Sequence, residues 1–195
     1  MMVKDIKSGV RSSSPNSFKA IGNTLFFAAD DGTNGEELWK SDGTASGTVM
    51  VKNINSIGDS SPDSLTAVGN TLYFTADDGT NGEELWKSDG TASGTAIIKD
   101  IYSGIYDSTP RHLTAVGNTL YFSADDGTHD TELWKSDGSA SGTVMVKDIN
   151  SIAGSSPDSL TAVGTTLYFT AYDSNNGREL WKSTGVSSGT VMVKD

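Results

Sequence analysis

The sequence contains no cysteine and only two histidines among its 195 residues. Without cysteine, the chain can form no disulfide, no thiolate zinc site and no cysteine nucleophile. Only 35% of the residues are hydrophobic, which is low for a conventional globular core. No apolar run is long enough to cross a membrane as a helix, and the start at Met1 lacks the apolar region of a signal peptide. We therefore expect a soluble chain with no membrane partner and no signal peptide.

Positive charge is also scarce. The 14 Lys and Arg residues are outnumbered by 25 Asp and Glu residues, which gives a formal net charge of -11. Binding to nucleic acid relies on clustered Lys and Arg that release counterions from the phosphates. We therefore expect no nucleic-acid partner, whereas an acidic surface is compatible with divalent cations.

Repetition is the main feature that the sequence does contain. The string EELWKSDGTASGT spans residues 36–48 and returns unchanged at 83–95. Tryptophan occurs at 39, 86, 134 and 181, so the period is 47 or 48 residues along the whole chain. Such a repeat decides the fold before any single element does. The sequence predicts one repeat domain over 1–195, with a spare outer strand at 1–7 and repeats at about 14–54, 61–101, 109–149 and 156–195.

Each repeat contains four short runs of β-branched and aromatic residues, separated by turn residues. In the second repeat these runs lie at about 64–68, 71–76, 83–88 and 95–101. The first two runs are joined by Gly69-Asn70, and a two-residue connection of this kind is typical of a tight β-hairpin. Each repeat is therefore predicted to form a four-stranded antiparallel sheet.

Tandem four-stranded units of roughly 40 to 50 residues are typical of a β-propeller, in which each sheet is one blade packed face to face against the next. Consecutive apolar residues such as Leu72, Tyr73 and Phe74 indicate sheets that are buried on both faces. Lysine occurs in the last run of every repeat, where it would protect the exposed outer edge. We predict an all-β fold, a β-propeller built from four tandem four-stranded antiparallel blades of about 47 residues.

The string E-L-W-x-x-D-G-T occurs at residues 37–44 and 84–91, and almost unchanged at 132–139. It resembles the bacterial ELWxxDGT repeat family, which is found in large and often secreted multi-repeat proteins. The resemblance implies a propeller-like array and a secreted or cell-surface bacterial location, and it carries over no catalytic residue. The fourth repeat departs from the motif at Thr184 and Val186. We interpret the motif as structural, with the tryptophan between blades and the Asp-Gly pair in a tight turn.

The loop between the second and third predicted strands is acidic in the first two repeats. Its side chains offer several hard oxygens beside a glycine, a combination that can bind calcium. The spacing differs from that of an EF-hand, and Arg178 replaces an acidic residue in the fourth repeat. The alternative is a solvated loop whose Asp and Asn side chains bond to their own backbone. The candidate calcium ligands are Asp30, Asp31, Asn34 and Glu36 in the first repeat and Asp77, Asp78, Asn81 and Glu83 in the second.

Both histidines lie in the third repeat, which makes this repeat different from the others. A histidine beside an aspartate can act in acid–base chemistry or in ligand binding. The candidate ligand-binding residues are Tyr106, Arg111, His112, His129 and Asp130. The alternative is variation without function on surface loops. No nucleophile elbow, phosphate-binding loop or zinc-protease motif accompanies these residues, so no catalytic residue is predicted.

These observations favour a non-enzymatic repeat scaffold or binding module that presents near-identical loop faces to a partner such as a glycan. Repeated copies of one surface permit avidity without a strong single site. A purely structural spacer array is one alternative. An enzyme with a site at the centre of the propeller is another.

The pattern of the last strand occurs five times, whereas each of the other three strand patterns occurs four times. The extra copy lies at the N-terminus. We therefore expect self-association into an eight-bladed homodimer, in which the N-terminal segment of one chain adds to the last sheet of the other. A closed four-bladed monomer is the alternative.

Overall fold

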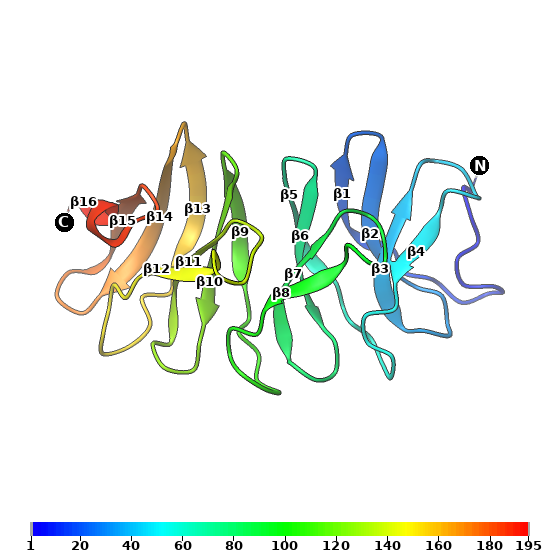
Figure 1. Cartoon of the computed structure of the whole chain (residues 1–195), viewed down its shortest axis with the longest axis horizontal. Helices are drawn as coiled ribbons and strands as arrows, with labels where there is room; N and C mark the ends of the chain where they lie inside the picture. The colour runs from blue at the N-terminus through cyan, green and yellow to red at the C-terminus, as the bar shows by residue number, and fades with distance from the viewer. Residues whose placement is uncertain (1, 195) are drawn as a thin grey trace.

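The structure is a computed structural model that describes residues 2–194, and nearly all of its regular structure is β (Figure 1). In this part of the chain, sixteen strands form four antiparallel four-stranded sheets, and the strands of each sheet follow one another in chain order. Within residues 2–194 the only helical element is a single 3-10 turn, η1 (Ser187–Gly189). The predicted all-β class and the four antiparallel sheets are confirmed.

Each sheet is formed by one repeat. The first sheet contains β1 (Asn16–Ile21), β2 (Thr24–Asp30), β3 (Glu36–Ser41) and β4 (Val49–Lys52). The second contains β5 (Asp63–Val68), β6 (Thr71–Asp77), β7 (Glu83–Ser88) and β8 (Ala96–Lys99). The third contains β9 (Arg111–Val116), β10 (Thr119–Asp125), β11 (Thr131–Ser136) and β12 (Val144–Lys147). The fourth contains β13 (Asp158–Val163), β14 (Thr166–Asp173), β15 (Gly177–Ser183) and β16 (Val191–Lys194).

The segment predicted as a spare outer strand forms no strand over residues 2–7, and Met1 lies outside the described residues. Lys4 Nζ donates a hydrogen bond to the carbonyl oxygen of Thr48 at 2.7 Å. Ile6 packs against the first sheet beside Trp39. Within residues 2–194 no strand pairs with this segment, so its side chains hold it on the first sheet.

Neighbouring sheets pack face to face, and Figure 1 shows them side by side from the first sheet to the fourth. The innermost strands β1, β5, β9 and β13 make the most extensive contacts between sheets. Between the first two sheets, Phe26 and Leu38 belong to one apolar cluster with Phe74 and Trp86. All four tryptophans occupy equivalent positions and are 4–6% exposed. The aromatic residues of the repeats therefore form the core between sheets, as the consecutive apolar residues predict.

The lysines of the outer strands also join the sheets, which differs from the edge protection that the sequence predicts. Lys52 Nζ lies 5.8 Å from the ring centroid of Trp86 in the next sheet, and it donates to the carbonyl oxygen of Thr95 at 2.8 Å. Lys99 and Lys147 make the same two contacts with the third and fourth sheets. The aliphatic part of lysine can cover apolar surface while its ammonium group faces an aromatic ring. These lysines therefore contribute to the packing between sheets.

The turn after each ELW strand explains why its sequence recurs so closely. Asp89 Oδ1 accepts hydrogen bonds from the backbone N–H and the hydroxyl of Thr91, at 2.8 and 2.7 Å. A Cβ on Gly94 would lie 2.1 Å from the same carboxylate oxygen, so only glycine fits there. The first and third sheets have the same turn. The motif therefore specifies a tight turn together with the tryptophan that packs between sheets.

The first and fourth sheets each leave part of one apolar face exposed. Leu25 of β2 is 36% exposed and Leu180 of β15 is 46% exposed. The leucines at the same two positions of the other sheets are fully buried. The two end sheets therefore do not cover each other.

Candidate functional site

The innermost strand of each sheet, which is the first strand of each repeat, departs from regular β-structure near its start. The second residue of each innermost strand has a positive φ although none is glycine, and the pairing register shifts beside it, for example between Asn16 and Lys19. Bulges of this kind redirect side chains, and they are frequent beside binding sites. The four residues are Ser17, Ser64, His112 and Ser159, with φ values of 52°, 57°, 60° and 55°.

These four side chains line a polar cavity of about 430 Å³ at the innermost strands. The next residue of each strand adds an apolar side chain to the lining. Hydroxyl, imidazole and carboxylate groups beside apolar surface can bind a polar organic ligand. The apolar residues are Phe18, Leu65, Leu113 and Leu160.

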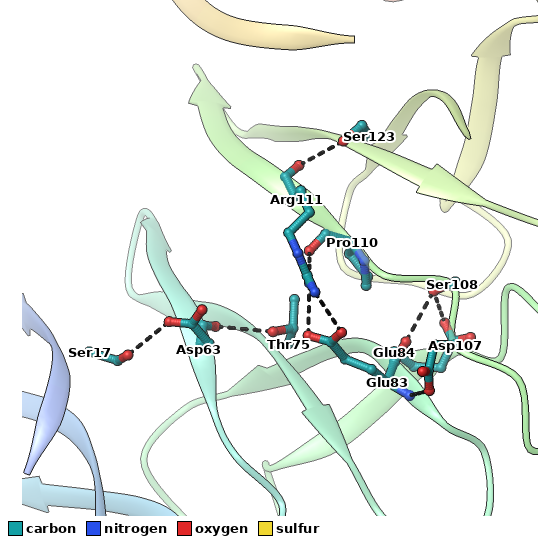
Figure 2. Close-up of polar contacts among 10 residues, drawn as sticks. All are labelled: Ser17, Asp63, Thr75, Glu83, Glu84, Asp107, Ser108, Pro110, Arg111 and Ser123. Atoms are coloured by element: carbon teal, nitrogen blue, oxygen red, sulfur yellow. Dashed lines mark hydrogen bonds and ion pairs between the residues drawn. The ribbon is translucent and has the colours of Figure 1, made fainter. Parts of the chain in front are cut away.

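Charged side chains connect neighbouring sheets around this cavity (Figure 2). Asp63 of the second sheet accepts a hydrogen bond from the hydroxyl of Ser17 in the first sheet at 2.8 Å. Arg111 of the third sheet donates two hydrogen bonds to the carboxylate of Glu83 in the second, at 2.8 and 2.9 Å. The bond to Glu83 raises the pKa of Arg111 above its usual value. The first pair joins the first sheet to the second, and the other joins the second sheet to the third.

A second cavity of about 430 Å³ lies between the third and fourth sheets. Its lining includes Arg111, His112, Asp158 and Arg178. His112 Nδ1 lies 3.6 Å from Asp158 Oδ1, and Arg178 donates to the carbonyl oxygen of Ser156 at 3.0 Å. The charges of the two arginines are balanced here by Asp158 in the lining and by Glu83, which pairs with Arg111.

The five residues predicted to form a ligand site lie in three separate places. Arg111 and His112 share the cavity between the third and fourth sheets. His129 and Asp130 line a smaller cavity of about 80 Å³, and Tyr106 packs against another tyrosine in the linker before the third sheet. The structure therefore brings Arg111 together with His112 and His129 together with Asp130, but it does not unite the five residues in one site.

Asp130 has an explanation in packing. It has a positive φ of 52° at a position where the other repeats have glycine. In the first repeat, a Cβ on Gly35 would lie 2.6 Å from Asp59 Oδ1 in the following linker. In the third repeat the linker residue at that position is Gly154, and a Cβ there would lie 3.0 Å from Cβ of Asp130. Only one of the two positions can carry a side chain, and the third repeat has exchanged them.

His129 replaces an asparagine that closes the same loop in the other repeats. In the first repeat, Asn34 Nδ2 donates to Asp31 Oδ2 at 2.7 Å. In the third repeat, His129 Nδ1 lies 2.9 Å from Asp126 Oδ2. This hydrogen bond raises the pKa of His129 above its usual value. His129 therefore takes part in closing its own loop.

The acidic loops of the first two repeats use their carboxylates locally. Asp31 Oδ1 accepts the backbone N–H groups of Thr33 and Asn34, both at 2.8 Å, and Asp78 accepts the equivalent bonds in the second repeat. Burial raises the pKa of Asp31, but the bonds from Asn34 and Thr33 outweigh this effect and leave the pKa below its usual value. These contacts correspond to the alternative of a loop closed by its own Asp and Asn side chains.

The other candidate calcium ligands also have partners, and several of these partners lie outside the loop. Within residues 2–194 no three His, Cys, Asp or Glu side chains are grouped closely enough to hold a metal ion. The contacts are Asp30 with Lys7, Glu36 with Asn16, Asp77 with Gly79, Asn81 with Asp78, and Glu83 with Arg111.

A glutamate that the sequence pattern did not predict to be functional is fully buried in the third strand of three sheets, at Glu37, Glu84 and Glu132. Glu84 accepts the backbone N–H groups of Ile101 and Tyr102, each at 3.1 Å. It also accepts the hydroxyl of Ser108 at 2.6 Å, as Figure 2 shows. Burial raises the pKa of Glu84 to about 7 despite these bonds. The available signal was an acidic residue beside Leu-Trp on a strand predicted to be buried on both faces.

No family model and no curated protein matches the chain. Among solved structures it is similar to the computationally designed Ika8 protein, with 17% identity and a TM-score of 0.51 over 99% of this chain and 51% of that one. The designed Ika4 protein gives 17% identity and a TM-score of 0.51 over 93% and 97%. A puromycin hydrolase gives 15% identity and a TM-score of 0.56 over 93% and 29%.

The chain thus spans about half the length of the Ika8 chain and less than a third of puromycin hydrolase. At these identities the similarity shows the fold alone. The chain is an all-β protein of four antiparallel four-stranded sheets, and β-propeller proteins are among the solved structures to which it is similar.

Proposed function

We propose that the chain is a β-propeller segment that acts as a non-enzymatic repeat scaffold and binds a ligand at the inner ends of its sheets. The face-to-face packing of successive sheets along their innermost strands supports the propeller. The similarity to β-propeller structures supports the same arrangement.

The use of the charged side chains supports a scaffold rather than an enzyme. Glu84 binds the linker that follows its sheet, and Arg111 binds Glu83 of the neighbouring sheet. A general acid or base has to reach the substrate, whereas these groups hold one repeat to the next. Repeat proteins depend on such contacts between nearest neighbours for their stability.

The observation that carries the binding function is the polar cavity of about 430 Å³ at the innermost strands. Ser64, His112 and Asp63 offer hydrogen-bonding groups there, beside the apolar surface of Phe18 and Leu65. A sugar presents hydroxyl groups around an apolar ring face, so it matches both kinds of surface. We propose a glycan as the ligand class and a secreted or cell-surface bacterial location, to which the ELWxxDGT resemblance also points. No helix within residues 2–194 is long and apolar enough to cross a membrane.

A glycan array tests this function, with hits measured again by calorimetry in calcium and in a chelator. His112→Ala should weaken binding at least about tenfold, because His112 lines the cavity. His129→Ala is the matched control and should leave binding unchanged, because its side chain lies in a different cavity. An array without hits would contradict the binding function and favour the structural spacer. Binding that needs calcium and survives His112→Ala would move the site to the acidic loops.

A further inference from the structure

The exposed face of the fourth sheet matches faces that are buried inside the chain. Leu85 of β7 is fully buried in the cluster that joins the second and third sheets. The equivalent residue of the fourth sheet is Leu180, nearly half of which is exposed. Val163 is 59% exposed, whereas Val68 and Val116 at the same position are 8% exposed. The fourth sheet therefore carries an apolar face of the kind that a following sheet covers elsewhere in the chain.

The first sheet carries the complementary face. Phe18 and Leu25 are exposed, and their equivalents Leu113 and Leu120 belong to the interface between the second and third sheets. Only the outer part of this face is covered, by Ile6. The exposed faces of the first and fourth sheets thus correspond to the two faces that meet between neighbouring sheets inside the chain.

Two sets of polar groups at these ends also match. Glu179 of β15 pairs with Ala171 through its backbone and occupies the position of Glu84, but within residues 2–194 its carboxylate accepts no hydrogen bond. The groups equivalent to its missing partners are the backbone N–H groups of Ile6 and Lys7 and the hydroxyl of Ser13. The carbonyl of Ser13 accepts the N–H of Asp30 at 3.0 Å, as the carbonyl of Ser108 accepts that of Asp125. The segment before the first sheet therefore carries donor groups that can bind a carboxylate. The fourth sheet carries the Glu179 carboxylate, which lacks such donors within residues 2–194.

We propose that the fourth sheet of one copy of the chain packs on the first sheet of a second copy, head to tail, with Glu179 bound by residues 6–13 of that copy. Lys182 then donates to the carbonyl oxygen of Gly43, as Lys135 donates to that of Gly185 at 2.8 Å inside the chain. The row of sheets matches about half of the Ika8 chain, so a second row can continue the first in the same fold. Two such junctions close a pair of chains into one ring.

At each junction two segments compete for the same position, that of the outer strand of the preceding sheet. Lys4 makes the contact with Thr48 that Lys52 makes with Thr95, so residues 2–6 already lie where a preceding outer strand would lie. β16 of the docking sheet would come to the same place. We expect residues 2–6 to stay, because Ile6 and its neighbour supply the N–H groups for Glu179, and β16 to move aside.

The absence of cysteine allows a directional test by crosslinking. Inside the chain, Ser17 Oγ lies 2.8 Å from Asp63 Oδ1 across one interface. The equivalent positions at the proposed junction are Ser159 of one copy and Asn16 of the other. The double variant Asn16→Cys, Ser159→Cys should form a disulfide-linked species of twice 20.4 kDa under mild oxidation. A mixture of the two single variants should form it too, and neither single variant alone should.

Light scattering provides the second readout. The unmodified chain should have a mass of twice 20.4 kDa, and Leu180→Glu should reduce it to that of one chain, with circular dichroism unchanged. The matched control is Val144→Glu, on the outer strand of an inner sheet, which is 37% exposed and should leave the mass unchanged. A single-chain mass for the unmodified protein up to millimolar concentration would overturn the proposal. A disulfide within one chain of the double variant would also overturn it, because the ring would then close with four sheets.

Discussion

Replacing Glu84 with alanine should destabilise the protein far more than its place in an acidic motif suggests. The substitution leaves the N–H groups of Ile101 and Tyr102 and the hydroxyl of Ser108 without their acceptor. An unpaired buried polar group costs about 1 to 3 kcal/mol. Water entering the vacated space can satisfy part of this demand, and removing a carboxylate that burial disfavours offsets another part. We therefore take the low end for all three groups and expect a loss of about 3 kcal/mol.

Glu179→Ala is the matched control, because Glu179 has the same position in the fourth sheet and its carboxylate accepts no hydrogen bond within residues 2–194. It should change the free energy of unfolding by less than about 0.5 kcal/mol. Urea unfolding followed by tryptophan fluorescence measures both values from the midpoint at constant slope. The protein should be dilute enough for light scattering to give a single-chain mass. Equal losses in the two variants would refute the anchoring role of Glu84.

Three further predictions concern charge, core and loop. Burial raises the pKa of Glu84 from 4.5 to about 7, and it also raises the pKa values of Glu37 and Glu132. The contribution of Glu84 to stability is therefore fully present below about pH 4.5 and is lost as the pH rises through about 7. Urea midpoints across this range should fall, and Glu84→Gln should reduce the fall without abolishing it, because Glu37 and Glu132 still titrate. Trp86→Ala removes a side chain that is 4% exposed and should lower the free energy of unfolding by about 3 to 5 kcal/mol, whereas a loss below about 1 kcal/mol would contradict its place in the core. Asp77→Ala removes an acceptor for the N–H of Gly79 and should cost under about 1 kcal/mol with or without calcium; a loss that appears only with calcium would show an ion site.

The repeats made the sheets predictable, because each strand is short, bounded by turn residues and present in four copies. The hairpin at Gly69-Asn70 illustrates this, since Val68 pairs with Thr71 across it. The burial of Trp86 followed from its place beside Leu85 on a strand with two apolar faces. Turn residues and short apolar runs lie within a single repeat, so they are sufficient to predict sheets in which consecutive strands pair.

The contacts between segments were not predictable in the same way. Glu84 binds N–H groups 17 and 18 residues further along the chain, and its acidic side chain gives no local sign of burial. The exchange of side chain between Asp130 and Gly154 depends on the two positions lying against each other in space, and their separation in the sequence gives no sign of this contact. The bulge that turns His112 toward the inner cavity depends on the pairing register, which the residue pattern leaves open.

Amide hydrogen exchange measured by NMR tests most directly whether the ELW repeats hold the sheets and linkers together. The N–H groups of Ile54, Ile101 and Ile149 lie outside the strands, but each donates to a buried glutamate, at 2.8, 3.1 and 3.1 Å. We predict that these three amides exchange as slowly as those of the neighbouring strands. Exchange at the rate of an open surface loop would contradict the role of the buried glutamates in joining one repeat to the next.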